Sequence, residues 1–116
     1  MTVRDVMTKT PYCCMITDTV QHAAGLMKWN HVGSIPVVNN FKERKLLGIV
    51  TDRDICLKIV AAGKQSTSKV SDAMTKTVAT SHVDDTIESC EAKMERHRVK
   101  RVPVVDSQGV CVGIVT

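Results

Sequence analysis

The sequence predicts an α+β fold that is assembled from two similar halves. Residues 3–38 recur 67 positions further on as residues 70–105, and 13 of the 36 aligned positions are identical. The run Gly-Ile-Val-Thr at residues 48–51 returns at residues 113–116, after a loop that is two residues shorter. A unit of half this chain can rarely bury its own hydrophobic face. We therefore expect the two copies to pack on each other and to leave clefts between them.

Each copy opens with the pattern Val-x-Asp-x-Met-Thr-Lys-Thr, which predicts a short helical turn followed by an extended segment. A helix is expected next, because Asp18 and Asp85 each stand three residues before Gln or Glu, as an N-terminal cap does. The apolar stripe of this helix is predicted at Val20, Ala24 and Met27 in the first copy and at Ile87, Cys90 and Met94 in the second, where Glu91 interrupts the helical spacing.

Strands are predicted where short β-branched runs end in a turn residue. They form one hairpin in each copy, with polar loops between the strands: residues 35–38 with 46–50, and residues 102–105 with 110–115. In the first copy a helix is expected over residues 52–62, with Gly63 at its C-terminal end.

The predicted organisation is a first repeat of residues 1–63, a polar linker of residues 64–69 and a second repeat of residues 70–116. The second repeat reaches Thr116, where its own closing helix would begin, so this helix is expected to be absent from the chain. The difference in length between the repeats lies in the hairpin loop, where insertions cost least.

Composition limits the class of protein. The 116 residues are 43% hydrophobic and 24% charged, as in an ordinary globular domain. No apolar run approaches the roughly 20 residues that cross a bilayer, and the N-terminus lacks the apolar stretch of a signal peptide. Five cysteines without CxxC spacing argue against a disulfide framework and a zinc cage. We expect a cytoplasmic protein with reduced thiols and no membrane contact.

The net charge of +4 permits anionic ligands without selecting one. Aromatic residues make up only 3% of the chain, so the stacking surfaces of single-strand nucleic-acid binders are missing. Nucleic acid is therefore not the expected partner.

Thr51 and Asp54 are the first candidates for ligand contact. The strand that ends near Thr51 enters a helix, where unpaired backbone N–H groups attract phosphate and the Thr51 hydroxyl supplies a further donor. The Asp54 carboxylate could accept both hydroxyls of a ribose. The alternative is that Thr51 and Asp54 only cap the helix.

Two motifs carry a resemblance to a known family. Ile-Pro-Val-Val at residues 35–38 and Gly-Ile-Val-Thr-Asp-Arg-Asp at residues 48–54, with their counterparts in the second copy, resemble a tandem pair of cystathionine β-synthase (CBS) domains, or Bateman module. The resemblance covers essentially the whole chain. It implies two βαββα repeats that pack through their sheets with pseudo-twofold symmetry. It also implies that AMP, ADP, ATP or S-adenosylmethionine binds between the repeats.

The resemblance assigns the same roles to Thr51 and Asp54 and implies that the second repeat forms the other wall of their cleft. Arg101 would grip phosphate through two parallel hydrogen bonds, with Arg96, His97 and Arg98 strengthening the local field. The alternative is a solvated basic helix end. The positions implied for this wall are Thr77, Val78, Ala79, Val99, Lys100, Arg101 and Val102.

A second cleft is expected to bind more weakly. The residue that corresponds to Asp54 would lie at position 119, which the chain does not reach, and the uncharged pair Gly33 and Ser34 stands where the second repeat has Lys100 and Arg101. The positions implied for this cleft are Pro11, Tyr12, Cys13, Gly33, Ser34, Ile35 and Thr116.

Nothing in the sequence points to catalysis or to a resident metal. The four histidines stand in dissimilar contexts, and none recurs at the repeat offset. His31 or His97 with a cysteine would be the residues to consider for a metal, but their spacing supports no known site. Cys13 and Cys14 are adjacent, and we expect them to face opposite ways because adjacent cysteines bridge only with strain.

Trp29 is expected outside the core of its repeat, because it points nearly opposite to Val20, Ala24 and Met27 on the predicted helix. Exposed aromatic residues often mark interfaces, so the sequence favours a homodimer. The function expected from the sequence is a non-catalytic adenine-nucleotide sensor that acts on an attached or separate effector domain. The alternatives are a structural dimerisation module with a vestigial cleft, and a small enzyme or redox protein.

Overall fold

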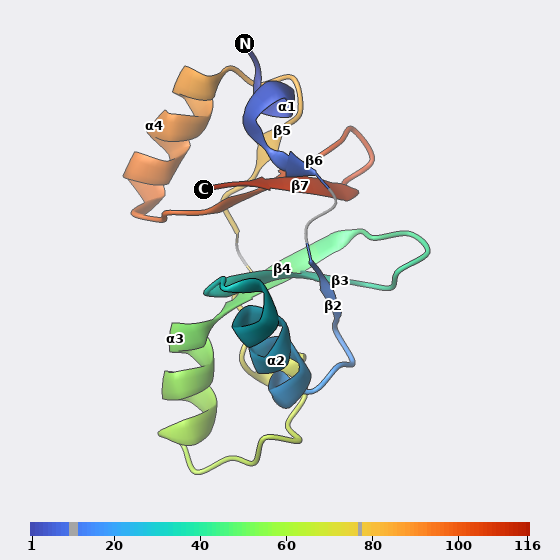
Figure 1. Cartoon of the computed structure of the whole chain (residues 1–116), viewed down its shortest axis with the longest axis vertical. Coiled ribbons are helices and arrows are strands. Elements are labelled where there is room, and N and C mark those ends of the chain that lie inside the picture. Colours follow the sequence, from blue (N-terminus) through green and yellow to red (C-terminus); the bar gives the residue numbers. More distant parts are fainter. Residues whose placement is uncertain (10–11, 77) are drawn as a thin grey trace. The chain divides into compact units, whose positions relative to one another are not determined.

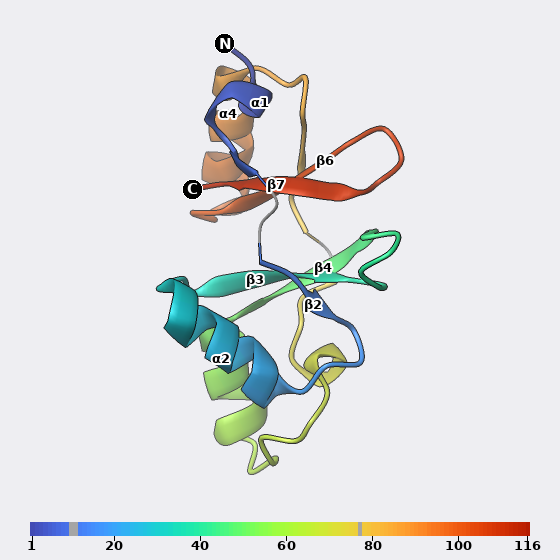
Figure 2. The same ribbon diagram turned by 45° about the vertical axis from the view of Figure 1, so that its right-hand side comes forward.

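The computed structural model describes residues 1–9, 12–76 and 78–116. The chain divides into two compact units, which Figures 1 and 2 show from two directions. Unit 1 consists of Met1–Pro11 and Val78–Thr116, and unit 2 consists of Tyr12–Thr77. Each unit has its own sheet and its own buried cluster.

Unit 2 holds a three-stranded sheet in the order β2-β3-β4, covered by helices. Strand β3 pairs parallel to β2 and antiparallel to β4. Figures 1 and 2 show α2 and α3 on the same face of this sheet. The elements are β2 (Cys14–Met15), α2 (Val20–Asn30), β3 (Ser34–Val38), β4 (Leu46–Thr51), α3 (Asp52–Ile55), the π-helical turn η1 (Cys56–Val60) and the 3₁₀ turn η2 (Val70–Asp72).

Unit 1 holds a four-stranded sheet in the order β1-β7-β6-β5, with α1 and α4 beside it. Strand β6 pairs parallel to β5 and antiparallel to β7, which repeats the pattern of unit 2. The elements are α1 (Val3–Val6), β1 (Thr8–Lys9), β5 (Ser81–His82), α4 (Ile87–His97), β6 (Val102–Val105) and β7 (Cys111–Val115). The α+β class and the tandem repeats predicted from the sequence are therefore confirmed.

The units exchange the opening segments of the two sequence repeats. Strand β1 precedes unit 2 in the chain but pairs with β7 of unit 1, where Thr8 lies opposite Ile114. Thr75 belongs to the opening segment of the second repeat, just before the Val78–Thr116 part of unit 1. It nevertheless forms an antiparallel bridge with Ile49 of β4 in unit 2. Each exchanged segment covers a sheet edge whose N–H and C=O groups would otherwise be unpaired. The compact units therefore contain different residue ranges from the sequence repeats 1–63 and 70–116.

The helix starts differ from the prediction by one residue. Thr19 and Thr86 are the N-caps, and their side chains accept hydrogen bonds from the backbone N–H groups of His22 and Ser89. The carboxylates of Asp18 and Asp85 instead accept from the N–H groups of Met15 and His82, in the turn before each helix. The prediction of aspartate caps was therefore wrong, because the shorter threonine side chain stands one residue nearer the helix.

The apolar stripe of α2 also differs from the prediction. Val20, Ala23 and Met27 are buried, whereas Ala24 is exposed. In α4 the buried residue is Cys90, as expected, and Glu91 is exposed. Trp29 is 79% exposed, which confirms that it lies outside the core of its repeat.

The remaining predicted elements agree with the structure, with two refinements. The helix after β4 begins at Asp52 as predicted, but it changes to π geometry over Cys56–Val60 before the chain turns at Gly63, whose φ is +72°. The two-residue strands β2 and β5 were not predicted from the sequence. None of the helices in the described part of the chain is long and apolar enough to span a bilayer.

Candidate functional site

The candidate residues of unit 2 lie where β3 begins and β4 ends. Ser34 of β3 stands opposite Thr51 of β4, and the carbonyl of Gly33 accepts a 2.9 Å hydrogen bond from the N–H of Asp52. A Cβ on Gly33 would lie 3.1 Å from Oδ2 of the exposed Asp52 side chain. The antiparallel pairing thus brings together Gly33, Ser34, Thr51 and the start of α3, although the sequence analysis assigned Gly33 and Ser34 to the second cleft and Thr51 to the first.

Thr51 and Asp54 form a reciprocal capping box at this junction. The N–H of Asp54 donates to Oγ1 of Thr51, and the N–H of Thr51 donates to Oδ2 of Asp54, each over 3.0 Å. This is the capping alternative considered from the sequence. It leaves the Thr51 hydroxyl hydrogen available as a donor, and the carboxylate retains acceptor capacity beyond these bonds.

The Asp54 carboxylate is also held by a lysine that the sequence analysis did not single out. Nζ of Lys58 lies 3.2 Å from Oδ1 of Asp54 and donates to the carbonyl of Ala73 over 3.2 Å. The Asp54 side chain is only 14% exposed. The i, i+4 spacing of Asp54 and Lys58 on a predicted helix was the signal that could have revealed this pair.

The candidate residues of unit 1 lie where the chain passes from α4 into β6. Helix α4 ends at His97, and the left-handed backbone of its C-cap residue Arg98 (φ 54°) turns the chain toward Val99 and Lys100. Val102 of β6 stands opposite Val115 of β7. Arg101 and Thr116 are the residues next to this pair, just before β6 and just after β7. This repeats the placement of Ser34 and Thr51 in unit 2.

Ser34 and Arg101 share an unusual property. They occupy equivalent positions in the two repeats, and each holds a buried polar atom, Oγ of Ser34 and Nε of Arg101, without a hydrogen-bond partner among the described residues. Oγ of Ser81, in β5, is a third such atom. Ser34 is 5% exposed. Buried polar atoms are nearly always satisfied in folded proteins, so two such atoms at equivalent sites suit polar groups supplied by a ligand.

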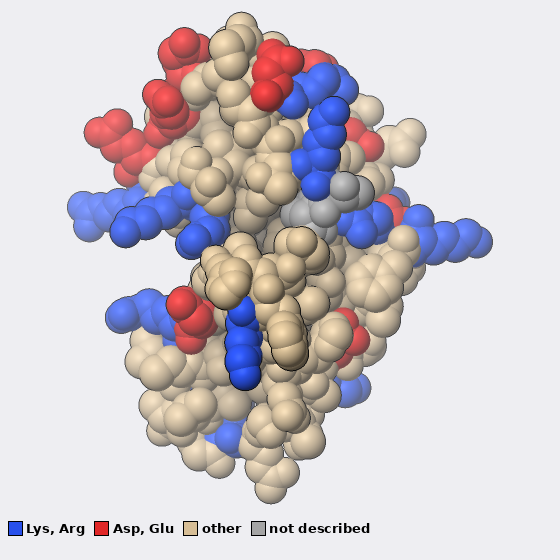
Figure 3. Space-filling model, viewed as in Figure 1, with Lys and Arg blue, Asp and Glu red and all other residues tan. Residues whose placement is uncertain are grey.

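Basic side chains surround this part of unit 1. Figure 3 shows acidic side chains over one end of α4 and basic side chains over the other end and the chain that follows it. The exposed residues Arg96, His97, Arg98 and Lys100 precede Arg101 within six positions. Such a cluster attracts anions, most strongly at low ionic strength.

The other predicted site residues have varied placements. Ile35 and Val102 are buried in the cores of their units, so only their backbones could meet a ligand. Tyr12 is exposed, whereas Val78 and Ala79 are half-buried. Pro11 and Thr77 lie outside the described residues.

Cys13 and Cys14 have different partners. Sγ of Cys13 accepts from the Arg44 guanidinium at 3.3 Å, and Sγ of Cys14 lies 3.9 Å from the carbonyl of Pro36. Burial raises the pKa of the Cys14 thiol to about 12, and the Asp18 carboxylate adds to this shift. Cys14 is therefore a core thiol at neutral pH rather than a nucleophile.

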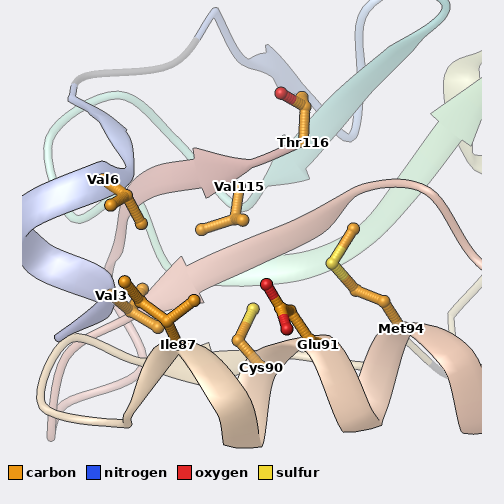
Figure 4. A pocket seen from close by; sticks show the side chains of 8 residues that line it. All are labelled: Val3, Val6, Ile87, Cys90, Glu91, Met94, Val115 and Thr116. Carbon is orange, nitrogen blue, oxygen red and sulfur yellow. The ribbon is translucent and has the colours of Figure 1, made fainter. Parts of the chain in front are cut away.

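Unit 1 also contains a largely apolar cavity of about 220 Å³ beside α4. Figure 4 shows the side chains of Ile87, Cys90, Glu91 and Met94 along one of its sides. In unit 2, a cavity of about 190 Å³ lies between α2 and the α3–η1 segment, and Val20, Ile55 and Ile59 are among the residues that line it. Among the described residues, no three His, Cys, Asp or Glu side chains gather closely enough to hold a metal ion.

The sequence matches the CBS domain family at residues 3–61 and again at residues 70–116. The chain therefore belongs to this family, as a tandem pair of CBS domains. This confirms the resemblance seen in the sequence motifs.

Two solved structures share the fold. The CBS domain pair of protein MJ0100, in complex with 5′-methylthioadenosine and S-adenosyl-L-methionine, has a TM-score of 0.86 and 30% identity, with 100% of this chain and 89% of that chain covered. CBSX2 in complex with AMP has a TM-score of 0.83 and 25% identity, with 99% of this chain and 89% of that chain covered.

Two relatives show the settings in which the module occurs. The chain is 36% identical to the CBS domain-containing protein YhcV of Bacillus subtilis, over 97% of this chain and 78% of YhcV. It is 37% identical to homoserine O-acetyltransferase of Methanococcus vannielii, over 98% of this chain but only 23% of that enzyme. CBS pairs of this kind thus occur within larger enzymes and in proteins little longer than this chain.

Proposed function

We propose that this chain is a non-catalytic regulatory module that binds an adenosine-containing nucleotide. In unit 2, Asp54 accepts the ribose hydroxyls and the Thr51 hydroxyl donates to the ligand. In unit 1, Lys100 and Arg101 are the basic groups that the family resemblance assigns to phosphate oxygens. The observation that carries the proposal is the pair of buried, unpartnered polar atoms, Oγ of Ser34 and Nε of Arg101, at equivalent positions of the two repeats.

The similar structures support adenosine as the common part of the ligand. One was solved with 5′-methylthioadenosine and S-adenosyl-L-methionine, and the other with AMP. The basic residues that precede β6 favour the phosphorylated ligands, because guanidinium and ammonium groups form strong hydrogen bonds with phosphate. We therefore rank AMP, ADP and ATP above S-adenosylmethionine for this chain.

Binding would regulate an attached or separate effector by shifting the chain between arrangements that differ in nucleotide affinity. A ligand shifts such an equilibrium only by its difference in affinity for the two states. The occurrence of similar CBS pairs within a larger enzyme supports an effector of this kind.

Calorimetric titration and thermal unfolding with adenosine, AMP, ADP, ATP and S-adenosylmethionine test the proposal. A ligand that binds only the folded chain raises its melting temperature, and the rise grows with the logarithm of the free ligand concentration above Kd. Asp54→Ala should abolish binding, whereas Asp72→Asn, which removes an exposed carboxylate of the same unit, should not. Arg101→Ala should weaken ATP more than adenosine. Binding of none of these compounds would favour a structural module with a vestigial cleft.

We also propose that the chain forms a homodimer through the helices of unit 2. Trp29 is exposed on α2, and Leu57 and Val60 are exposed on η1. Exposed large apolar side chains of this kind are typical of interfaces. Light scattering should give a dimer mass that Trp29→Ala reduces, whereas Phe41→Ala, an exposed aromatic residue of the hairpin loop, should leave the mass unchanged.

A further inference from the structure

Lys58 forms an ion pair with Asp54, the residue proposed above to accept the ribose hydroxyls. Its ammonium lies 3.2 Å from Oδ1 of Asp54, while Oδ2 of the same carboxylate accepts from the N–H of Thr51. The two oxygens are therefore held from two directions, one by the strand end and one by the next turn of the helix. Such a carboxylate has little freedom to rotate about its side-chain bonds.

Lys58 itself is held by a second contact. Its ammonium donates to the carbonyl of Ala73 over 3.2 Å, and Ala73 is fully buried. The neighbouring backbone is fixed, because the N–H groups of Ala73 and Met74 both donate to the carbonyl of Val70. A surface lysine in an i, i+4 pair commonly samples many rotamers, and such a pair contributes little. Here the carbonyl of Ala73 anchors the ammonium in place.

Two other ion pairs of the chain allow a comparison. The Lys93 ammonium likewise joins a carboxylate, that of Asp85, to a backbone carbonyl, that of Thr80, over 3.0 and 3.1 Å. The Lys58 side chain is 44% exposed.

The guanidinium of Arg4 lies 3.0 Å from Oδ1 of Asp84, but both of those side chains are more than half exposed. The Asp54 side chain is 14% exposed, and its partner Lys58 bridges it to a buried carbonyl. The Asp54 pair is thus more ordered than the Arg4 pair.

We propose that Lys58 is a positioning residue that sets the preference of this module for ribonucleotides over deoxyribonucleotides. It keeps Asp54 in the orientation in which the remaining acceptor sites of the carboxylate face both hydroxyls of a ribose. A site that is preorganised for two hydroxyl groups rejects a ligand that lacks one of them, because a charged acceptor is then left without its partner. The inference rests on the proposed function, since it assigns a role to a neighbour of the proposed ribose acceptor.

The test compares the affinity for AMP with those for 2′-deoxy-AMP and 3′-deoxy-AMP, measured by calorimetry. The unaltered chain should prefer AMP by about tenfold or more, as expected for a hydrogen bond to a charged group. In Lys58→Met this preference should fall at least threefold, with little change in the affinity for either deoxynucleotide. Lys58→Arg, which keeps a cationic donor, should restore most of the preference.

A matched control is Lys64→Met, which removes another lysine of unit 2 whose side chain is exposed. It should leave the preference for AMP unchanged. Because Lys58→Met removes the donor to a buried carbonyl, Lys58→Gln provides a second variant that retains a shorter donor. Circular dichroism of the ligand-free variants shows that each is folded before its affinities are compared.

The outcomes separate this inference from the proposed function. If the unaltered chain binds none of the three nucleotides, the proposed function is wrong and the role of Lys58 falls with it. If it prefers AMP and both Lys58→Met and Lys58→Gln retain the full preference, only the role of Lys58 is overturned. A purely structural role would lower the melting temperature of the variants and leave the preference unchanged.

Discussion

Thr51 and Asp54 bond each other reciprocally across the first turn of α3, each backbone N–H donating to the other side chain over 3.0 Å. The same two side chains are the proposed contacts for ribose and ligand donors. Capping and binding are therefore compatible, because a threonine hydroxyl can accept one hydrogen bond and donate another. The capping box fixes both side chains before a ligand arrives, which lowers the entropic cost of binding.

Replacing Thr51 by valine should destabilise the chain by about 1 kcal/mol, because the helix loses a side-chain cap. Valine keeps the shape of threonine and removes the hydroxyl, whose oxygen accepts from the N–H of Asp54 in the ligand-free chain. Urea unfolding at pH 7 measures the change. Thr67→Val removes an exposed hydroxyl in the same unit and should change the free energy of unfolding much less. Equal stability of the two variants would contradict the capping role.

Alanine substitutions at two glycines of unit 2 should change the free energy of unfolding in opposite directions. A Cβ on Gly48 would lie 2.5 Å from the carbonyl oxygen of Thr75, whereas a Cβ on Gly25, inside α2, would meet nothing within 4 Å. Gly48→Ala should therefore destabilise the chain by about 2 kcal/mol or more, because the exchanged segment must shift away from β4. Gly25→Ala should stabilise it by roughly 0.5–1 kcal/mol.

Thermal unfolding of the two alanine variants, followed by circular dichroism, is the measurement. The close approach at Gly48 depends on the bridge between Ile49 and Thr75. A melting temperature for Gly48→Ala at or above that of the unaltered chain would show that this segment does not pack on β4 as described.

Much of this fold was predictable from the repeat alone, because both copies carry the same order of helix, strand and strand. The exchange of opening segments was not, since the pattern at residues 3–10 and 70–77 specifies a turn and an extended segment but not the edge with which it pairs. Ala23 was missed as a core residue because the alanines at 23 and 24 are identical in sequence, and only packing against the sheet distinguishes them.

The candidate site was predictable in part. Thr51, Asp54 and Arg101 stand in motifs with a physical role at a strand end or before a strand. Lys58 was not found, because its contact with the carbonyl of Ala73 joins residues 15 positions apart through a turn that the sequence does not specify. Ser34 was predicted to line the second cleft, expected to be the weaker because Ser34 carries no charge, whereas the structure shows that its hydroxyl is buried without a partner among the described residues.

The ionised carboxylate of Asp85 stabilises unit 1, and this stabilisation is lost at acid pH. The N–H of His82 and then the Lys93 ammonium hold the pKa of this carboxyl below its ordinary value of 3.8. The unfolded chain therefore binds a proton at a pH where the folded chain does not. The stabilisation is fully present above the unfolded pKa and is lost as the pH falls through the folded pKa.

Asp85→Asn should accordingly lower the free energy of unfolding at pH 7, and its difference from the unaltered chain should shrink as the pH falls below about 4. Urea unfolding at pH 7, 5, 4 and 3 measures this. Asp84→Asn is the matched control, because Asp84 is 70% exposed and its pair with Arg4 contributes little. A destabilisation by Asp85→Asn that is the same at every pH would exclude the ionic explanation.

The C-cap residues of the two long helices are sites where glycine should increase stability. His31 follows α2 and Arg98 follows α4, and both adopt left-handed backbone with φ of 54°. A non-glycine residue in this conformation destabilises the folded chain by about 1 kcal/mol. Glycine avoids this cost, but its greater freedom in the unfolded chain offsets part of the gain. His31→Gly and Arg98→Gly should each raise the free energy of unfolding by about 0.5 kcal/mol. His22→Gly, inside α2, should lower it by about 0.5 kcal/mol or more, since glycine is a poor helix former. Thermal unfolding distinguishes these signs, and a loss of stability in both C-cap variants would show that the side chains of His31 and Arg98 contribute more than their backbone costs.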